Sequence, residues 1–322
     1  MSTQAPSVTI AIPTFNGLNC LRPSIDTFIG QEYPGDLRIL VMDSGSTDGT
    51  IEFLEEKGIE VERLPSHPFN HGRTRNDLVN LVASELVLFT VQDARPRSSR
   101  WVQDMVDALL ISGSDAVCGG QCVPQGTETN PMQWFRPIQD SRAITTYTSR
   151  DYDMSDDEGR CMMCRWDNVN ALYKTGVLKE IPFPQTEFGE DLAWARTALN
   201  SGKRIGYCDG RKVDHYHHQN PTFVRTRTIC TAFSRWSNFN VIPQKGPSIN
   251  PFWWIQLIYT LILRRRIISP LRLIHWLKHN WKNQRARNAA ILEVRKAIDD
   301  GTIVALHASL NDPKAAAPNP SH

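Results

Sequence analysis

The stretch that decides the fold is Phe89-Thr-Val-Gln-Asp-Ala94, an apolar run that ends in a single acid, Asp93. A second apolar run, Ile39-Leu-Val-Met-Asp43, ends the same way and leads into Ser44-Gly-Ser-Thr-Asp-Gly-Thr50, whose residues favour a tight turn and a helix cap. In an open α/β sheet, ligands bind beyond the carboxyl ends of the strands. We therefore expect both acids to face one crevice, although an isolated Asp-Ser-Gly is also typical of a simple turn.

Strand and helix patterns alternate around these two runs. We expect strands at residues 8–13, 39–43, 61–64 and 86–91, and helices at 18–29, 49–57, 73–83, 101–111 and 190–201. This alternation predicts an α/β fold with a doubly wound, mostly parallel sheet over about the first 120 residues. Beyond Cys122, polar loops replace the regular pattern until the helix at 190–201, and we interpret them as ligand-side loops of the same domain.

The bulk composition is that of a folded globular chain. Its 322 residues are 40% hydrophobic and 22% charged, which is enough for one large or two fused domains. We expect four parts: residues 1–122 and 123–235 as two halves of one domain, 236–311 as a helical segment that is basic and aromatic, and 312–322 as a disordered tail.

Cysteine use and charge add two expectations. The seven scattered cysteines, with no signal peptide before Val8, predict reduced thiols in the cytoplasm. Cys161-Met-Met-Cys164 lacks the second pair of a zinc site, and we assign it no metal.

The net charge of +2 conceals a charge of +7 on residues 261–300, which contain ten Lys/Arg and three acids. An acidic body with a basic segment predicts an anionic surface as partner of that segment.

Six segments together resemble the family 2 glycosyltransferases of the GT-A fold, and within them the bacterial rhamnosyltransferase-like group. They follow in the family's order between Ser7 and His218: Val8-Thr-Ile-Ala-Ile-Pro-Thr-Phe-Asn16, Val41-Met-Asp-Ser-Gly-Ser-Thr-Asp-Gly-Thr50, Phe69-Asn-His-Gly-Arg-Thr-Arg-Asn76, Val91-Gln-Asp-Ala94, Phe188-Gly-Glu-Asp191 and Val213-Asp-His-Tyr-His217. The resemblance gives no guide to residues 236–322. It implies inverting transfer of a sugar from a nucleotide diphosphate donor to a hydroxyl of a glycan or lipid-linked glycan.

The donor presents a base, a ribose and a diphosphate whose charge must be neutralised as the glycosidic bond breaks. Asp43 is expected to accept a hydrogen bond from a pyrimidine imide, and Phe15 to form a wall for the base unless it is a core aromatic. Arg75 and Asn76, at a helix start, are expected to meet the diphosphate unless Arg75 is only a solvated helix residue. The predicted donor-binding residues are Pro13, Thr14, Phe15, Asn16, Asp43, Arg75, Asn76 and Gln92.

Asp93 is the predicted metal ligand, because Mg²⁺ and Mn²⁺ take carboxylate and phosphate oxygens. The chain departs from the family's Asp-x-Asp pattern, since Val91 stands where the first acid would be. The resemblance places His215 at the family's metal-binding histidine, with His217 as the rival, and imidazole suits Mn²⁺ better than Mg²⁺. We predict a divalent metal cofactor held by Asp93 and His215. The alternative is that residues 215–218 form only a polar loop.

Asp191 is the predicted general base. Inverting transfer needs one carboxylate on the acceptor side to take the hydroxyl proton, and the family's base aligns with Asp191. Glu190 is expected to hold the acceptor or a nearby loop, and Asn168 and Asn170 to line the acceptor pocket. The alternatives are that the two acids only stabilise a helix N-terminus and that the two asparagines are turn residues.

Among donors, deoxythymidine diphosphate rhamnose is favoured by the resemblance in Phe69–Asn76 and Val91–Ala94, and UDP-hexoses stay open. A non-catalytic nucleotide-sugar or glycan-binding module is a second hypothesis, but such a module needs no base at Asp191. A nucleotidyltransferase would carry a Gly-rich basic loop after the first strand, unlike Asn16-Gly-Leu-Asn19. No nucleic-acid partner is predicted.

The run Phe252–Leu263 is too short to cross a membrane. As a helix its twelve residues extend about 18 Å, against a hydrocarbon core of about 30 Å. Arg264-Arg-Arg266 closes the run, and Trp and Leu then alternate with Lys and Arg. This pattern predicts an in-plane position on an anionic leaflet and a cytoplasmic protein that is peripheral on the membrane. The alternative is a helical pair packed on the catalytic domain or in a dimer interface.

Overall fold

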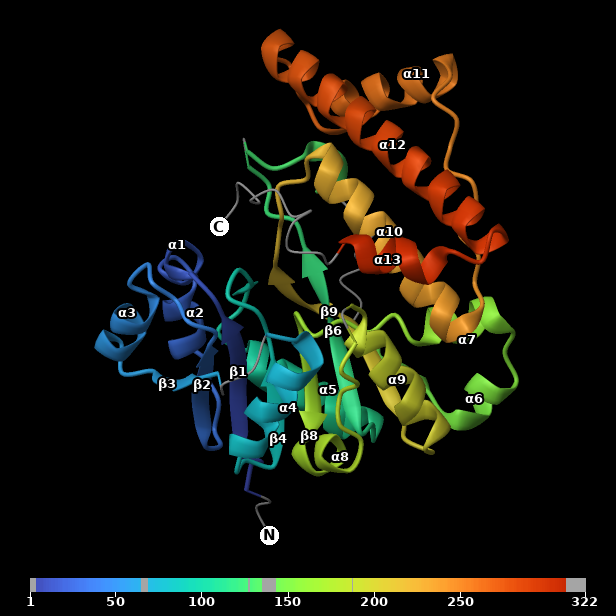
Figure 1. Ribbon diagram of the computed structural model, residues 1–322. Helices are drawn as coiled ribbons and strands as arrows, with labels where there is room; N and C mark the ends of the chain where they lie inside the picture. The colour runs from blue at the N-terminus through green and yellow to red at the C-terminus, as the bar shows by residue number, and fades with distance from the viewer. Residues whose placement is uncertain (1–3, 65–68, 127, 135–142, 187, 311–322) are drawn as a thin grey trace. The chain divides into compact units, whose positions relative to one another are not determined.

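The computed structural model describes residues 4–64, 69–126, 128–134, 143–186 and 188–310 (Figure 1). The tail predicted at 312–322 lies outside the described residues. Two compact units form: unit 1 is Met1–Cys122 with Pro137–Tyr216, and unit 2 is Val123–Arg136 with His217–Ser321. The segment 123–235, predicted as one half of the catalytic domain, is thus shared between the two units.

Unit 1 contains, within the described residues, a single nine-stranded sheet with the order β3-β2-β1-β4-β8-β6-β9-β5, in which β7 also pairs with β9. The strands are β1 (Val8–Thr14), β2 (Leu37–Asp43), β3 (Glu60–Arg63), β4 (Leu86–Phe89), β5 (Arg95–Pro96), β6 (Ala116–Cys122), β7 (Thr145–Tyr147), β8 (Ala171–Lys174) and β9 (Ile205–Asp214).

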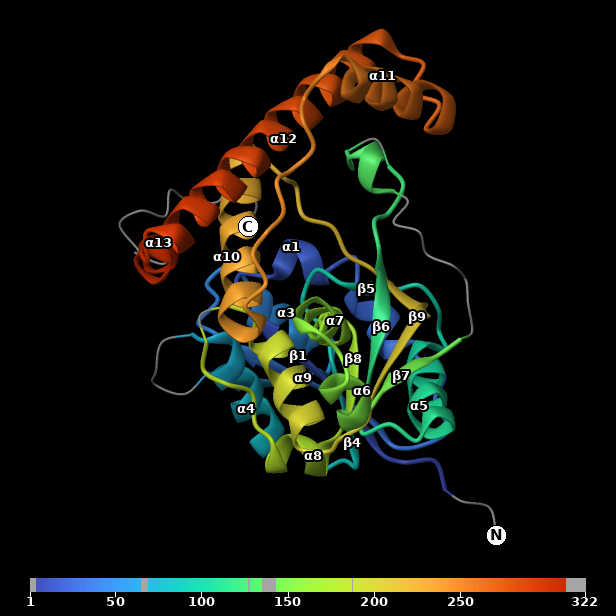
Figure 2. The same cartoon turned by 90° about the vertical axis from the view of Figure 1, so that its right-hand side faces the viewer.

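Helices cover both faces of this sheet. They are α1 (Leu18–Leu21), α2 (Ile25–Ile29), α3 (Thr50–Glu56), α4 (His71–Leu81), α5 (Trp101–Ser112), α6 (Ser149–Asp153), α7 (Asp157–Met163), α8 (Thr175–Glu180) and α9 (Glu190–Asn200). Figure 2 shows α4 and α9 on one side of the sheet and α5 on the other. The single helix predicted at 18–29 is wrong: the chain forms α1 and α2 instead, because Pro23 lacks the N–H that would continue the helix.

The predicted parallel arrangement holds for the first four strands, since β1 pairs in parallel with β2 and β4, and β2 with β3. Strand β8 is antiparallel to both of its neighbours, β4 and β6. The interpretation of the chain beyond Cys122 as loops was therefore wrong, because β8 lies in the middle of the sheet. A strand of four residues, followed directly by α8, is too short to show a periodic pattern.

These pairings place several strand ends together. Since β8 runs opposite to β4 and β6 runs opposite to β8, β6 runs parallel to β4, and β9 is parallel to β6. The carboxyl ends of β1, β2, β4, β6 and β9 therefore lie at one edge of the sheet, where β8 begins. Apolar side chains such as Ile10, Val41 and Leu88 are fully buried and hold the strands in register beneath this edge.

Unit 2 is helical in its described part. It contains the short 3₁₀ turn η1 (Pro131–Gln133), α10 (Pro221–Phe239), α11 (Pro251–Tyr259), the π-helical turn η2 (Thr260–Arg264), α12 (Pro270–Asp299) and α13 (Ile303–Leu310). One apolar cluster joins α10, α12 and α13 around Ile229 and Val294. A second joins α11, η2 and α12 around Leu261 and Trp276. None of the helices in the described segments has the length and apolar character needed to span a membrane.

Candidate active site

Polar side chains from segments far apart in the sequence meet at the carboxyl edge of the sheet in unit 1. In the order of the strands across the sheet, β2 ends in Asp43, β1 leads into Phe15 and Asn16, and β4 leads into Gln92 and Asp93. Residues 166–170 precede β8, β6 carries Gln121, and β9 leads into His215. The topology thus brings most of the predicted site residues to one edge, as expected for an α/β sheet.

Asp43 organises the loop that follows β2. Its carboxylate accepts hydrogen bonds from the backbone N–H groups of Gly45 and Ser46, each at 2.8 Å, and from the Ser46 hydroxyl. Asn16, which follows β1 with a left-handed backbone, is tied to the same loop: its N–H donates to Ser46 Oγ at 2.7 Å, and its Oδ1 accepts from the Thr47 N–H at 2.9 Å. Asp43 therefore has the turn role considered as the alternative, and its predicted contact with a base stays a prediction.

Gln92 joins the loop after β4 to the loop after β1. Its Oε1 accepts from Thr14 Oγ1 at 2.7 Å and from the Phe15 N–H at 2.9 Å, and its Nε2 donates to the Phe15 carbonyl at 3.3 Å. Phe15 is 46% exposed and is not the core aromatic considered as the alternative. Pro13 is half-buried in β1 beside these residues. The four predicted donor residues 13–16 thus form the end of β1 and the loop that follows it, and Gln92 braces this segment.

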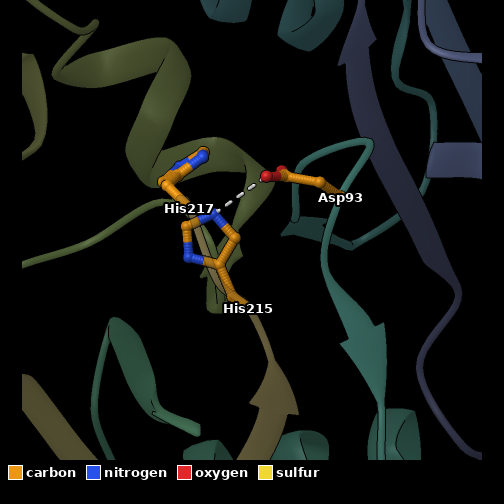
Figure 3. Close-up of side chains that lie close together, drawn as sticks. All are labelled: Asp93, His215 and His217. Atoms are coloured by element: carbon orange, nitrogen blue, oxygen red, sulfur yellow. Dashed lines mark ion pairs between the residues drawn. The ribbon is translucent and has the colours of Figure 1, made fainter. Parts of the chain in front are cut away.

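Asp93 and His215 face each other, as Figure 3 shows. The distance from His215 Nε2 to Asp93 Oδ2 is 3.4 Å, and both side chains are largely buried. His217, which is exposed, follows two residues later, and one ligand atom of each of these three side chains lies within 4.8 Å of the others. A carboxylate oxygen beside two imidazole nitrogens is a donor set that Mn²⁺ accepts. The structure therefore brings both predicted metal ligands together.

Gln121 and Asp167, which were not predicted, connect this pair to the rest of the site. His215 Nδ1 lies 2.8 Å from Gln121 Oε1, and Gln121 Nε2 donates to Asp167 Oδ2. Because an ionised carboxylate only accepts, Asp167 fixes the orientation of the Gln121 amide, and the amide oxygen then requires the proton of His215 on Nδ1. In a neutral imidazole with the proton on Nδ1, the lone pair is on Nε2, the atom that faces Asp93, and this is the orientation that a metal-binding imidazole needs.

Glu190, the first residue of α9, forms a buried ion pair with Arg75 of α4. Arg75 Nη1 lies 2.6 Å from Glu190 Oε1, and the two side chains are 6% and 7% exposed. Asn168 Nδ2 approaches the same oxygen at 3.4 Å. Burial raises the pKa of Glu190, but the charges of Arg75 and then His71 outweigh it, so the pKa is lowered overall. Arg75 is not the solvated helix residue considered as the alternative, and its predicted contact with a diphosphate stays a prediction.

Asp191, half-buried beside Glu190, has the opposite electrostatic environment. Burial, then the charge of Glu190 and then that of Asp167 raise its pKa well above the usual range of a carboxyl group. Its Oδ1 accepts from the Leu192 N–H at 2.7 Å. Two adjacent carboxyl groups with pKa values moved in opposite directions are typical of sites where one acid stays charged and the other exchanges a proton.

Three predicted residues have internal partners. The Asn76 amide exchanges two hydrogen bonds of 2.9 Å with the backbone of Phe183. Asn170 accepts from Trp101 Nε1 at 2.9 Å and donates to the carbonyls of Gly120 and Arg211, so it joins β6 and β9 to α5. Asn168 accepts from the Tyr173 hydroxyl and is buried. These contacts hold the framework of the site, and acceptor binding by Asn168 and Asn170 stays a prediction.

Sequence reasoning missed Gln121 because no strand was predicted at residues 116–122, where the structure has β6. The same argument that selected Asp43 and Asp93, a polar residue at the carboxyl end of a buried strand, applies to β6 and would have found it. Asp167 precedes β8, which the sequence pattern did not reveal. Its position next to Asn168 was the only available signal.

Comparison with known proteins agrees with this geometry. The family model "Glycosyl transferase family 2" matches residues 9–171, just over half of the chain. The O-antigen chain rhamnosyltransferase RfbN of Salmonella typhimurium is 28% identical over 223 residues, which cover 66% of this chain and 68% of that protein.

Two solved structures share the fold. Staphylococcus aureus TarS 1–349 in complex with UDP-GlcNAc has a TM-score of 0.55 at 15% identity, over 90% of this chain and 92% of that chain. This chain covers 55% of a longer TarS chain whose structure has also been solved. The mannosyltransferase PcManGT from Pyrobaculum calidifontis, in complex with GDP-Man and Mn²⁺, has a TM-score of 0.55 at 17% identity, over 95% of this chain and 80% of that chain. The chain belongs to glycosyl transferase family 2 and is a glycosyltransferase with a GT-A-like α/β fold.

Proposed function

We propose that this enzyme transfers a sugar, with inversion, from a nucleotide diphosphate donor to a hydroxyl of a glycan or lipid-linked glycan, and that L-rhamnose from dTDP-rhamnose is the favoured donor. The observation that carries the proposal is the chain of contacts from Asp93 through His215 and Gln121 to Asp167, whose charge acts on Asp191. It joins a carboxylate–imidazole pair to a carboxyl group with a raised pKa. The name of RfbN supports rhamnose, and the ligands of TarS and PcManGT support the donor class.

The donor would lie along the end of β1 with residues 15–16, which Gln92 braces, and along the loop after Asp43. Phe15 offers an exposed aromatic face to the base. The loop is held by Gln92 and Ser46, so it is already ordered before the donor arrives. Less conformational entropy is then lost on binding.

Asp93 and His215 would hold a divalent metal, with Mn²⁺ favoured by the imidazole, and His217 is a further candidate ligand. When bound, such a metal supplies positive charge to the leaving diphosphate. The part played by the chain itself is the orientation of His215, because Gln121 keeps a proton on Nδ1 and leaves Nε2 toward Asp93. The absence of an acid at Val91 leaves one carboxylate in this ligand set.

Asp191 would take the proton of the acceptor hydroxyl. A carboxylate with a raised pKa is a stronger base than an ordinary aspartate, and its half-buried position leaves it open to an acceptor. Glu190 stays ionised against Arg75, and its charge contributes to the raised pKa of Asp191. In this proposal Arg75 acts through Glu190 and holds it in place at the start of α9.

We also propose that the enzyme is peripheral on an anionic membrane surface through unit 2. Exposed apolar side chains accompany the basic run Arg264–Arg266: Phe252 is 73% exposed, Ile268 85% and Leu271 81%. Large apolar side chains beside cations are typical of helices that lie in a membrane interface. The lipid-linked form of the acceptor would be presented at such a surface.

The donor is tested by a panel of nucleotide sugars, with thermal stability of the purified protein and product formation as readouts. We expect dTDP-rhamnose with Mn²⁺ to give the largest stabilisation and the only efficient transfer. A clear preference for a UDP-hexose would show that dTDP-rhamnose is not the donor, but it would leave the proposed transfer reaction in place. Donor binding with no transfer to any glycan acceptor, together with an unchanged result for Asp191→Asn, would favour the non-catalytic module.

A further inference from the structure

A cavity of about 300 Å³ lies within unit 2, lined by residues of η1, α11, η2 and α12. Seven of the described side chains that line it are carboxamides, including Gln219, Gln256, Asn280 and Asn283. Trp253 and Thr260 complete much of the remaining wall. Among the described lining residues there is no acid, and Arg287 is the one with a fixed charge. The wall is therefore polar, almost neutral and rich in planar amides.

The amides are held in fixed orientations. Asn130 and Asn280 exchange two side-chain hydrogen bonds of 3.0 and 3.2 Å. Asn280 Nδ2 also donates to the Trp276 carbonyl at 2.8 Å, and Gln133 donates to Gln219 Oε1 at 2.6 Å. The first bonds join Asn130, which precedes η1, to α12, and the last joins η1 to Gln219, which precedes α10. A wall that is ordered before a ligand binds loses little conformational entropy on binding.

Asn283 is a buried residue of the cavity wall. It is only 6% exposed, its Nδ2 donates to the Gln219 carbonyl at 2.9 Å, and the same nitrogen lies 3.0 Å from His279 Nε2. These contacts fix the orientation of the Asn283 amide in the wall.

The chemistry of the wall selects the ligand class. A carboxamide offers both a donor and an acceptor, which matches the hydroxyl groups of a sugar, and it carries no charge that would favour a nucleotide or a phosphate. Trp253 offers an apolar face for the C–H groups of a sugar ring. The cavity has the volume of about ten water molecules at about 30 Å³ each, which suits the dozen heavy atoms of one monosaccharide unit.

We propose that this cavity, defined by Asn130, Gln219, Trp253, Gln256, Asn280 and Asn283, is a binding site for one neutral sugar residue of a glycan. The proposal rests on unit 2 alone and not on the transfer reaction. It gives unit 2 a carbohydrate-binding function in addition to the proposed membrane binding around Arg264–Arg266.

The test uses the full chain and the methyl glycosides of L-rhamnose, D-mannose, D-glucose and D-galactose, with binding followed by saturation-transfer NMR and titration. The variant combines Gln256→Ala, which removes an exposed amide, with Thr260→Val, which replaces the hydroxyl by a methyl group of similar size, and neither residue belongs to an apolar cluster. We expect at least one glycoside to bind the wild-type chain and the variant to bind it at least tenfold more weakly. The matched control is Gln244→Ala, an exposed glutamine of unit 2 outside this cavity, which should bind as the wild type does.

Two further measurements keep this proposal separate from the proposed function. Asp191→Asn, in unit 1, should leave glycoside binding by the cavity unchanged whatever it does to transfer. Inorganic phosphate should not compete with the glycoside. Equal affinity of the wild type and the Gln256/Thr260 variant, no binding of any of the four glycosides by the wild type, or displacement by phosphate would each overturn the assignment.

Discussion

Two ion pairs with the same length show how differently the two units are built. Arg75–Glu190 in unit 1 and Arg225–Glu293 in unit 2 both have a nitrogen–oxygen distance of 2.6 Å. The side chains of the first pair are 6% and 7% exposed, and those of the second are 40% and 37% exposed. Burial, and not distance, decides what such a pair contributes, because water screens the exposed charges.

The same contrast runs through the functional surfaces. At the sheet edge of unit 1, a few side chains with fixed partners set the position and charge of Asp191. On the surface of unit 2 around Arg264–Arg266, three cations stand beside exposed apolar side chains, and each cation adds to the charge of that surface. Single substitutions are therefore expected to have large, specific effects in unit 1, and graded, additive effects in unit 2.

The largest effect is expected for Asp191→Asn. The amide cannot take the acceptor proton, so turnover should fall on the order of 10²–10⁴-fold while donor affinity stays near that of the wild type. Initial rates and isothermal titration with the donor measure the two quantities. A variant with near-normal turnover would remove Asp191 from the role of base.

Replacing Arg75 by Met tests the ion-pair comparison directly. It leaves Glu190 charged, buried and without its cation, so we expect the free energy of unfolding to fall by about 3–5 kcal/mol. Arg225→Met is the matched control in unit 2 and should lower it by no more than about 1 kcal/mol, because that pair is exposed. Chemical denaturation measures both, and similar losses in the two variants would contradict the comparison.

In unit 2, Arg264, Arg265 and Arg266 are replaced together by Gln. Each basic residue near an anionic leaflet contributes about 1 kcal/mol, so binding to anionic vesicles should weaken by up to about 3 kcal/mol and should also weaken as salt rises. The control replaces Arg22, Arg100 and Arg150 of unit 1, which removes the same charge. Co-sedimentation measures the binding, and equal binding to neutral and anionic vesicles, or none to either, would favour the packing or dimer alternative.

Gln121→Leu tests the orientation of His215. The leucine cannot accept from Nδ1–H, so we expect Mn²⁺ affinity to fall about 10–100-fold, while Asp93→Ala, which removes a ligand, should lower it further. Titration of Mn²⁺ followed by electron paramagnetic resonance reads binding without any need for turnover. Gln103→Leu, on α5, is the control. Unchanged Mn²⁺ affinity in Gln121→Leu would show that His215 needs no such support.

The smallest expected effect is a shift in pH dependence. Asp191 works as a base only when ionised, so its raised pKa should move the acid limb of the kcat/KM profile above the range of an ordinary aspartate. Glu190→Gln removes a charge that raises this pKa and leaves Arg75, which lowers it, so the limb should move to lower pH. Glu180→Gln, which removes the 58% exposed acid of the ion pair with Lys203, should leave it in place. A shift to higher pH in Glu190→Gln would contradict the electrostatic assignment.

The sequence by itself determined the family, the α/β class and the end of the strand that carries Asp43, whereas β4 ends at Phe89 and Asp93 lies in the turn that follows it. These follow from local properties, since apolar periodicity and turn residues act over a few positions. The order of six short motifs also selected Asp191 and His215, and the structure brings Asp93 and His215 together. The break at Pro23 was visible in the same local terms and was overlooked.

Only the tertiary structure decided how these residues are connected. The Gln121–Asp167 bond joins residues 46 apart in sequence, and the Arg75–Glu190 pair joins residues 115 apart. The first depends on β8 lying between β4 and β6, and the second on the packing of α4 against α9. A strand of four residues does not reveal its neighbours, because strand pairing is set by packing across the whole sheet. The burial of Arg75 also depends on the tertiary structure. The sequence shows only that a helix carries an arginine at this position, and the fold places the carboxylate of Glu190 beside it.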